Sequence, residues 1–325
     1  MSRVLIIKTS SLGDVVHNLP VISDILAARP DTIVDWVVEE AYADLPRLHR
    51  GVHRVIPVAQ RRWRRSLAPA ARSEKRNFDD QLRQDPYDLV LDTQGLVKSG
   101  ILTRAARLAP GGARVGFSRR LAREGLARLF YDRGYDVAPH LHAIERVRAL
   151  AGQALGYQPS GLPRFDIAAP QMHFDWLGGR NYAVLLHATS RAEKAWDATA
   201  WRGLIDRLAH AGIDSVLLHG SEREQHAALD LVEGRAGALI APRLKLAEAS
   251  ALIAQARTVI GVDTGLTHLA AALDVPTVAL FGATARWRYA PYWTERAVSL
   301  GEEKRQPTLD EVIATLDALG VSMNS

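Results

Sequence analysis

Four short polar segments of this 325-residue chain carry side chains that can bind an anion or move a proton. They are Lys-Thr-Ser-Ser-Leu-Gly-Asp at residues 8–14, Asp-Thr-Gln-Gly-Leu-Val-Lys-Ser at 92–99, His-Ala-Thr-Ser-Arg-Ala-Glu-Lys-Ala-Trp at 187–196, and Val-Asp-Thr-Gly-Leu-Thr-His at 262–268. Hydroxyl groups, a lysine and the free amides at a helix start bind phosphate, and a carboxylate such as Asp14 can act as a general base. The residue types therefore predict an anionic ligand, and a diphosphate suits the amides that follow Asp263 and Thr264.

Each segment also has a purely structural interpretation, which the residue types alone leave open. Asp14 could be only the N-cap of the next helix, and Asp263 or Thr264 could cap another beside a half-buried His268. The segments at 92–99 and 187–196 could be an ordinary turn and a solvated charged loop. Neither a Gly-x-Gly-x-x-Gly nor a Walker motif occurs in the four segments, which argues against the standard dinucleotide and P-loop sites. Their shared position after a predicted strand, in both halves of the chain, is what favours a binding site.

The elements that position these segments are predicted as alternating strands and helices. Short apolar runs predict buried strands at residues 4–7, 34–38, 54–58, 88–91, 183–186, 215–218, 258–262 and 277–281. Amphipathic segments predict helices at 15–28, 97–108, 201–211, 222–233, 246–255, 266–273 and 310–319. Pro20 should kink the first helix or delay its start. This alternation is typical of parallel sheets in α/β proteins, whose ligands bind beyond the carboxyl ends of the strands.

The length and a change of composition predict two domains. A chain of 325 residues exceeds the usual size of one hydrophobic core, and Pro and Gly residues break any regular pattern between residues 156 and 179. We therefore expect an α/β fold with two doubly wound, Rossmann-like domains facing across a cleft, at residues 1–160 and 175–305. A helix within residues 308–320 is expected to pack back on the first domain.

Composition and charge exclude several kinds of site. The chain has no cysteine, which rules out disulfides, thiolate nucleophiles and cysteine-based zinc sites. Its formal charge of +5 is compatible with nucleic acid, an anionic membrane surface or an acidic substrate. Basic residues crowd one stretch, namely Arg61, Arg62, Arg64, Arg65, Arg72, Lys75 and Arg76. The first residues do not resemble a signal peptide, and no run reaches the ~20 apolar residues of a membrane span. We expect a cytoplasmic protein that can touch a membrane without crossing it.

Three of the four segments, taken with further motifs, resemble the ADP-heptose:lipopolysaccharide heptosyltransferase family, and its type I members in particular. The further motifs are Asp-Trp-Val-Val-Glu-Glu at residues 35–40, Arg-Arg-Trp-Arg at 61–64, Leu-Phe-Tyr at 129–131 and His-Ala-Ile-Glu-Arg at 142–146. The resemblance implies the two-domain glycosyltransferase B fold and an inverting transfer of L-glycero-D-manno-heptose from ADP-heptose, with no cofactor and no catalytic metal. For type I members it implies Kdo₂-lipid A as the acceptor, reached by peripheral contact with the cytoplasmic face of the inner membrane.

The same resemblance implies roles for individual residues. Asp14 matches the family's catalytic base, and Asp263 matches the residue that holds the heptose hydroxyls. The residues expected to bind the donor are Thr189, Ser190, Lys194, Glu224, Asp263, Thr264, Gly265 and His268. The residues expected to bind the acceptor are Ser11, Gly13, Arg61, Arg62, Arg64, Gln94, Lys98, Arg123 and Arg146. Asp197 stands where the family often has Pro, which we interpret as a changed helix start.

Three other functions remain as alternatives. A different heptosyltransferase of the same family, acting on a later acceptor of the core, would share the donor site. A noncatalytic nucleic-acid-binding protein is suggested by charge alone, without a helix-turn-helix, zinc or RNP signature. A nucleotide-sugar epimerase or dehydrogenase would need the Gly-rich fingerprint that the segments lack. The motifs favour the type I heptosyltransferase over all three and predict no nucleic-acid partner.

Overall fold

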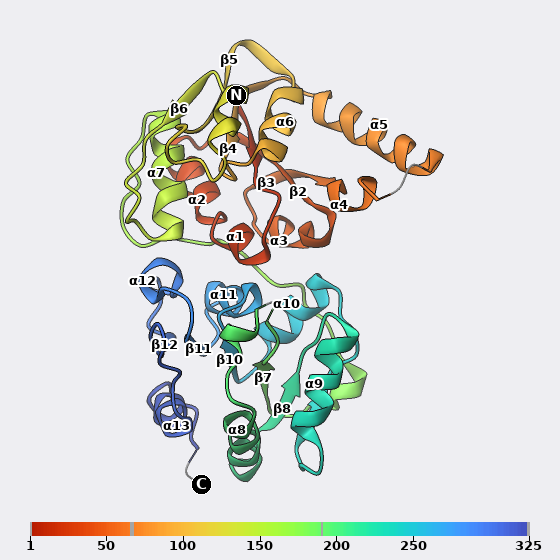
Figure 1. Ribbon diagram of the computed structural model, residues 1–325, viewed down its shortest axis with the longest axis vertical. Coiled ribbons are helices and arrows are strands. Elements are labelled where there is room, and N and C mark those ends of the chain that lie inside the picture. The colour runs from red at the N-terminus through yellow and green to blue at the C-terminus, as the bar shows by residue number, and fades with distance from the viewer. Residues whose placement is uncertain (1, 66–67, 190, 324–325) are drawn as a thin grey trace. The chain divides into compact units, whose positions relative to one another are not determined.

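The structure, a computed structural model, describes residues 2–65, 68–189 and 191–323. The chain forms two compact units, Met1–Ile167 and Ala168–Ser325 (Figure 1). Their boundary lies inside the stretch at 156–179 where Pro and Gly residues predicted it. Each unit contains one six-stranded sheet in which neighbouring strands run parallel, with helices on both faces. The predicted α/β fold with two doubly wound units is confirmed.

The sheet of the first unit has the strand order β3-β2-β1-β4-β5-β6. β5 and β6 were not predicted, because Pro110, Gly111 and Gly112 interrupt the first and the second has only three residues. The central strands are buried on both faces, which is why they form nearly continuous apolar runs in the sequence. The strands are β1 (Arg3–Ile7), β2 (Ile33–Glu39), β3 (Val52–Val58), β4 (Tyr87–Asp92), β5 (Leu108–Phe117) and β6 (Arg133–Tyr135).

Two of the helices in the first unit differ from their predictions. Pro20 is the first residue of α2, so the predicted helix over 15–28 is two helices with a break before the proline. α6 ends at Ala105 instead of Leu108, because Leu108 begins β5. The helices are α1 (Leu12–Val16), α2 (Pro20–Ala28), α3 (Asp44–Arg47), α4 (Gln60–Trp63), α5 (Pro69–Arg83), α6 (Val97–Ala105) and α7 (Ala143–Leu155), with 3₁₀ turns η1 (Glu40–Tyr42) and η2 (Gly125–Phe130).

The α7 helix is held against α2 by a buried cation. Arg148 is 1% exposed and lies 2.7 Å from Asp24 on α2 and 2.9 Å from Glu145 on its own helix. Its guanidinium also donates to the carbonyl oxygens of Ser160 and Gly161. Because all of these contacts satisfy one buried charge, Arg148 fixes the end of the first unit to its core.

The second unit has the strand order β12-β11-β10-β7-β8-β9. Its strands are β7 (Tyr182–Leu186), β8 (Asp214–Leu217), β9 (Ala238–Ile240), β10 (Thr258–Val262), β11 (Thr277–Leu280) and β12 (Ala297–Leu300). Its helices are α8 (Ala198–His210), α9 (Glu222–Val232), α10 (Leu246–Ala254), α11 (Gly265–Ala272), α12 (Arg286–Tyr289) and α13 (Leu309–Ala318), with 3₁₀ turns η3 (Asp175–Leu177) and η4 (Ala192–Lys194). Asp197 is the N-cap of α8 and accepts a hydrogen bond from the Ala200 amide, as expected of a changed helix start.

The C-terminal helix α13 belongs to the second unit, whereas the sequence led us to expect it on the first domain. It packs against α8, β11 and β12. Its buried side chains Val312, Ile313 and Leu316 join the hydrophobic core that also contains Trp196 and Trp201. The apolar face of α13 predicted a packing partner but could not identify which sheet would supply it. Within the described part of the chain, no helix is long and apolar enough to cross a membrane.

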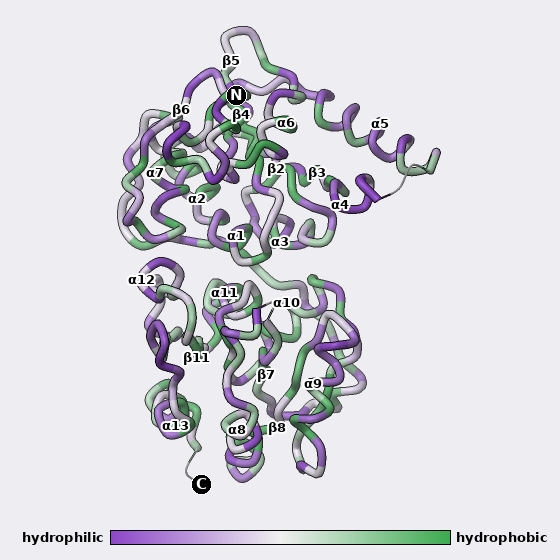
Figure 2. Tube along the Cα trace, in the orientation of Figure 1, coloured by the Kyte–Doolittle hydropathy of each residue, from purple (hydrophilic) through white to green (hydrophobic). Residues whose placement is uncertain are grey.

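The two sheets share one topology. When the strands of each unit are numbered from its own beginning, both sheets have the order 3-2-1-4-5-6. In such a sheet all strands are parallel, but the direction in which successive strands are added reverses between strands 1 and 4. Ligands bind beyond the carboxyl ends of these two strands. The reversal lies between β1 and β4 in the first unit and between β7 and β10 in the second. Figure 2 shows the apolar residues concentrated in these strands, while the outlying helix α5 is mostly hydrophilic.

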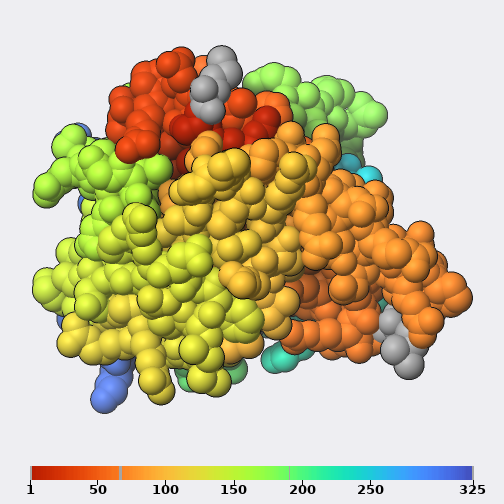
Figure 3. All heavy atoms as spheres, turned by 90° about the horizontal axis from the view of Figure 1, so that it is seen from above, coloured from red at the N-terminus to blue at the C-terminus, as the bar shows by residue number. Residues whose placement is uncertain are grey.

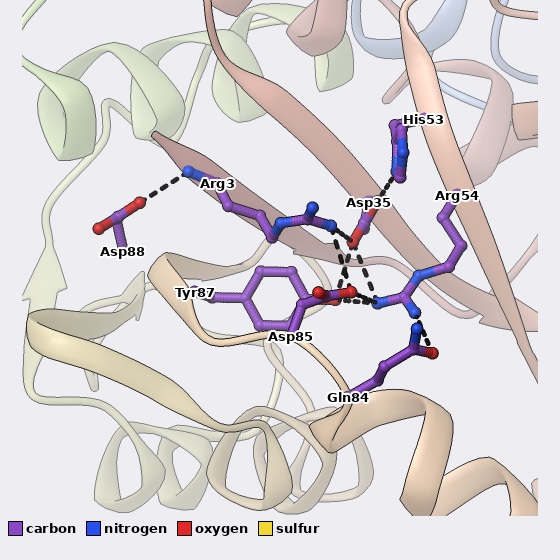
Figure 4. A network of polar contacts seen from close by, with 8 residues as sticks. All are labelled: Arg3, Asp35, His53, Arg54, Gln84, Asp85, Tyr87 and Asp88. Carbon is purple, nitrogen blue, oxygen red and sulfur yellow. Dashed lines mark hydrogen bonds and ion pairs between the residues drawn. The ribbon is translucent and has the colours of Figure 1, made fainter. Parts of the chain in front are cut away.

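The amino-terminal ends of β1 to β4 are tied together by a buried polar network (Figure 4). Asp35 is fully buried and accepts hydrogen bonds from Arg3, Arg54 and Tyr87, at 3.0, 3.2 and 2.9 Å. His53 lies 2.9 Å from its other oxygen. Burial and the adjacent carboxylate raise the pKa of Tyr87, so this tyrosine stays protonated and donates to Asp35. The network joins four neighbouring strands at the edge of the sheet opposite the carboxyl ends.

Candidate active site in two halves

The four polar segments all lie at the switch points of the two sheets, where the strand order reverses. The segment at 8–14 follows β1 and the segment at 92–99 begins at the end of β4. In the second unit, 187–196 follows β7 and 262–268 begins at the end of β10. Because the paired strands are adjacent, each unit brings its two segments together. The sequence predicted that each segment follows a strand, and the topology adds that each pair meets at a switch point.

Asp14 lies in the first half of the site, in the first turn of α1. Its Oδ2 accepts hydrogen bonds from the backbone amide and the hydroxyl of Ser11, both at 3.1 Å. Ser11 is the N-cap residue and Asp14 is the third residue of the helix. Asp14 is therefore not the N-cap residue itself, but it is the second member of a capping box and does stabilise the start of the helix. The same two hydrogen bonds orient its carboxylate. Gly13 lies in the same turn, where it carries no side chain beside the carboxylate.

Two cations lie beside Asp14. Lys8 Nζ is 3.9 Å from Asp14 Oδ1, and Arg123 Nη1 is 3.6 Å from Oδ2. Burial opposes ionisation of Asp14, but the charges of Lys8 and Arg123 and the Ser11 amide outweigh it and lower its pKa to about 2. Asp14 is therefore a carboxylate throughout the neutral range, in the form that can accept a proton.

Lys8 is the residue of this half that the sequence prediction missed. Its side chain is 7% exposed, and its ammonium donates to the carbonyl oxygen of Thr93, at 3.3 Å. Burial lowers the pKa of Lys8, while the nearby carboxylates of Asp14 and Asp92 favour its charged form. A lysine directly after a buried strand, six residues before a carboxylate, was the available signal, because few lysines are buried without an acidic partner.

The segment after β4 supports the loop that carries Asp14. Gln94 is 3% exposed, and its Oε1 accepts hydrogen bonds from the amides of Thr9 and Ser10 at 3.0 and 3.2 Å. Lys98 donates to the Ser10 hydroxyl at 3.4 Å. Gln94 and Lys98 were predicted to bind the acceptor, and the structure places both beside the first segment, where Gln94 uses its oxygen to hold the loop.

The remaining predicted arginines lie on other elements of the first unit. Arg62, on α4, pairs with Glu40 at 2.9 Å and with Glu74 at 2.6 Å. Arg61 and Arg64 are exposed at the same helix, which follows β3, two strands away from β1. Arg146, on α7, has its guanidinium carbon 5.4 Å from the centre of the Phe117 ring, a cation–π contact. The structure groups Asp14, Ser11, Gly13, Gln94, Lys98 and Arg123 closely. Three of the other arginines act on this group from separate elements. The charges of Arg61 and Arg64 add to burial in lowering the pKa of Lys98, and the charge of Arg146 adds to burial in lowering the pKa of Lys8.

The second half of the site is organised by Asp263, at the end of β10. Its Oδ2 lies 2.6 Å from Lys194 Nζ, and its Oδ1 lies 3.0 Å from His268 Nε2. Burial opposes ionisation of Asp263, but the His268 hydrogen bond and charge, with those of Lys194, lower its pKa well below the usual range. An ammonium has three N–H groups, and Lys194 directs two of them to Asp263 Oδ2 and to its carbonyl oxygen. Among the described residues, which do not include Ser190 of the same loop, the third N–H has no partner, so it can donate to an anion.

The start of α11 adds backbone donors to the second half. Thr264 is the N-cap and Gly265 the first residue of this eight-residue helix, whose first amides have no acceptor within the helix. The turn is tightly packed, because a Cβ built on Gly261 would lie 2.3 Å from Thr267 Oγ1. Thr267 also donates to the carbonyl oxygen of Val262 at 2.7 Å. The amides of this turn, beside Lys194, form the kind of positive site that binds phosphate.

The other predicted donor residues lie in the loops after β7 and β8. Thr189 accepts a hydrogen bond from the Arg191 amide at 3.4 Å, and Ser190 lies outside the described residues. Glu224, on α9, accepts from the Gly220 amide at 2.6 Å and so holds the loop after β8. His187 Nε2 lies 3.2 Å from the carbonyl oxygen of Glu224, which links the two loops.

Each unit, taken by itself, carries one kind of group that transfer from a phosphorylated donor needs. The first half has an ionised carboxylate oriented by Ser11, and the second has a lysine and helix amides for an anion. Among the residues that the structure describes, no group of three His, Asp or Glu side chains is placed to hold a metal ion.

Comparisons with known proteins point to one family and one fold. The model of glycosyltransferase family 9 (heptosyltransferase) matches residues 75–316. Lipopolysaccharide heptosyltransferase 1 of Pseudomonas aeruginosa is 46% identical over 284 residues, covering 87% of this chain and 79% of that protein. The structure of E. coli heptosyltransferase WaaC with ADP has a TM-score of 0.87 and 39% identity, covering 98% of this chain and 99% of that one. A second WaaC structure, with ADP-2-deoxy-2-fluoro heptose, has a TM-score of 0.82 and 40% identity, covering 97% and 99%.

Proposed function

The chain belongs to glycosyltransferase family 9, the heptosyltransferases, and we propose that it transfers L-glycero-D-manno-heptose from ADP-heptose to the Kdo of Kdo₂-lipid A. The observation that carries this proposal is the ionised Asp14, held by Ser11 between Lys8 and Arg123. The ADP-heptose donor is supported by the solved relative with an ADP-heptose analogue. The transfer adds the first heptose of the lipopolysaccharide inner core.

The proposed reaction is one direct displacement with inversion at the anomeric carbon. The acceptor hydroxyl oxygen forms a bond to that carbon while Asp14 takes the hydroxyl proton. The bond between the anomeric carbon and the diphosphate oxygen breaks, and ADP leaves as an anion. The third N–H of Lys194 and the amides at the start of α11 stabilise the charge that develops on the diphosphate. Asp263, with its charge balanced by Lys194 and His268, is assigned to the heptose hydroxyls.

This mechanism uses no metal ion, because Lys194 and the helix amides supply the positive charge. We therefore propose that transfer persists in EDTA. The Kdo carboxylates of the acceptor are assigned to Arg123 and to the exposed Arg61 and Arg64. Arg62 already pairs with two glutamates, so it can bind the acceptor only by sharing or exchanging them.

The decisive experiment measures ADP release and heptose transfer with Kdo₂-lipid A in the presence of EDTA, for the unaltered protein and for Asp14→Asn. We expect transfer by the unaltered protein and a loss of at least about 100-fold in Asp14→Asn, in line with the contribution of a general base. ADP binding should be retained, since Asp14 lies in the first unit and the phosphate contacts lie in the second. Near-normal turnover of Asp14→Asn would show that another group accepts the proton.

Acceptor choice is tested in the same assay. The alternative within the family is transfer to a later acceptor of the core. Kdo₂-lipid A and its mono-heptosylated form are therefore compared at equal concentration. Faster transfer to the mono-heptosylated form would overturn the proposed acceptor while leaving the proposed donor in place.

A further inference from the structure

The net positive charge of the chain is concentrated in the segment from α6 to β6. Residues 98–133 contain nine Lys and Arg residues and two acidic residues, a net charge of +7, against +5 for all 325 residues. The rest of the chain is therefore slightly acidic, and the basic character of the protein is localised. This segment is gold to yellow-green in Figure 3, where it is exposed across the middle of the face shown.

The same segment also exposes large apolar side chains. Ile101 on α6 is 52% exposed, and Leu126 and Leu129 on η2 are 60% and 79% exposed. Leu126 and Leu129 are three residues apart in a 3₁₀ turn, so they lie on the same side of it. α6 packs closely on η2, because a Cβ on Gly100 would lie 2.6 Å from the Phe130 ring. Ile101 follows Gly100 in the sequence, and Leu129 precedes Phe130, so the exposed apolar side chains belong to two elements that are in contact.

Exposed arginines lie on the same helix or shortly before the same turn. Arg104 is one turn after Ile101 on α6, and Arg119 and Arg120 precede η2. Arg120 pairs only weakly with an exposed carboxylate, at 3.7 Å from Asp136. Apolar side chains flanked by cations are the composition that binds at the interface of an anionic bilayer, where the leucines enter and the arginines meet lipid phosphates.

We propose that Ile101, Leu126 and Leu129, with Arg104, Arg119 and Arg120, form a surface that docks on an anionic phospholipid bilayer. We call it the docking surface. Charge complementarity selects this occupant, since the surface concentrates the positive charge of an otherwise slightly acidic chain. The inference rests on the proposed function only in its purpose, which is to bring the site to an acceptor lipid that lies in a membrane.

The docking surface is rigidly connected to the first half of the site. Glu124, two residues before Leu126, accepts from the Val97 amide at 2.6 Å, and its own amide donates to Gly95 at 2.9 Å. Arg123, the preceding residue, lies 3.6 Å from Asp14. A bilayer bound at Leu126 would therefore hold the proposed base at a fixed height above the lipid headgroups.

The test is sedimentation of the full chain with vesicles of phosphatidylethanolamine containing about a quarter phosphatidylglycerol, without any acceptor lipid. We expect salt-sensitive binding, and weak binding to pure phosphatidylcholine. The double variant Leu126→Gln, Leu129→Gln should bind at least about tenfold more weakly, because each buried leucine contributes about 1.5–3 kcal/mol and 1.4 kcal/mol is tenfold. The matched control is Leu162→Gln, Leu229→Gln, which changes two leucines that are 61% and 50% exposed outside the surface.

A charge variant tests the second part of the surface. Arg119→Gln, Arg120→Gln should weaken binding to the phosphatidylglycerol vesicles and reduce its salt dependence, and Arg223→Gln, Arg243→Gln should do neither. Equal losses in surface and control variants, or no binding of the unaltered protein without acceptor, would overturn the docking surface.

A water-soluble, deacylated acceptor separates this inference from the proposed function. The leucine variant should transfer heptose to the soluble acceptor at the unaltered rate, because neither leucine belongs to the proposed site. If the unaltered protein binds vesicles yet transfers no heptose to the soluble acceptor, the docking surface stands and the proposed acceptor fails. A parallel loss of vesicle binding and of soluble transfer in the leucine variant would reflect damage to the fold, and the arginine variant then decides. Unchanged vesicle binding by Arg119→Gln, Arg120→Gln would overturn the docking surface.

Discussion

Replacement of Lys8 by glutamine should raise the pKa of Asp14 into a range that can be measured. The ammonium of Lys8 is buried and lies 3.9 Å from Asp14, where solvent screens it little. Glutamine is polar and uncharged but one bond shorter than lysine, so its amide falls short of the Thr93 carbonyl oxygen that Lys8 contacts at 3.3 Å. The substitution therefore removes the charge and weakens this hydrogen bond.

The size of the shift follows from the surroundings of the carboxyl group. An opposite charge at this distance lowers a carboxyl pKa by about 1–3 units, so its removal should move Asp14 from about 2 to about 3–5. The side chain of Arg123 is 58% exposed, and at 3.6 Å in water its attraction is about 1 kcal/mol, less than one pKa unit. Arg123→Gln should therefore shift Asp14 less than Lys8→Gln does.

The assay is a titration of the Asp14 carboxyl carbon by NMR, assigned by its absence in Asp14→Asn. A protonated Asp14 cannot accept a proton, so the turnover number of Lys8→Gln should also fall as the pH drops through the raised pKa. The unaltered protein should show no such fall until it unfolds in acid. A midpoint in Lys8→Gln within half a unit of the unaltered protein, or a larger shift in Arg123→Gln, would refute this reasoning.

Three further substitutions have expected outcomes. Lys194→Ala removes a charged donor and leaves the negative charge of Asp263 without its cation. ADP affinity measured by calorimetry should therefore fall about 10- to 150-fold. An unchanged affinity would show that Lys194 does not contact the phosphates. Gly261→Ala places a Cβ 2.3 Å from Thr267, which should cost about 1–3 kcal/mol of unfolding free energy in urea, and an equal midpoint would contradict this packing. Arg148→Ala removes the charge-assisted hydrogen bonds between a buried guanidinium and the partly exposed carboxylates of Asp24 and Glu145, so a loss of about 1.5–3 kcal/mol is expected in the same urea assay. A loss below about 1 kcal/mol would contradict this role of Arg148.

The elements nearest the site were the easiest to predict from the sequence. The central strands β1, β4, β7 and β10 are covered on both faces, so their apolar runs are nearly continuous. Edge strands such as β6 and β9 have three residues each and are not fully buried, so they leave little pattern. The polar segments were found because they follow the central strands, whereas the edge strands carry none of them.

The contacts within the site were harder to predict than its residues. The sequence identified Asp14 but not its charged neighbour Lys8, and it identified Gln94 without showing that its oxygen holds the first loop. Such pairings depend on which strands are adjacent in the sheet, and no local sequence pattern reveals the strand order. The partner of α13 was missed for the same reason, because an apolar helix face fits the core of either unit.

The shared strand order of the two sheets has a consequence for how such an enzyme can diversify. Both units have the same sheet topology, yet their switch points carry different groups. The first presents the Asp14 carboxylate beside two cations, and the second presents the Lys194 ammonium held by Asp263. Each set of loops is supported by the hydrogen bonds of its own sheet. On the proposed assignment of the acceptor to the first unit and of the donor to the second, substitutions that suit a new recipient sugar can accumulate after β1 and β4. The groups for the leaving nucleotide are then inherited intact after β7 and β10.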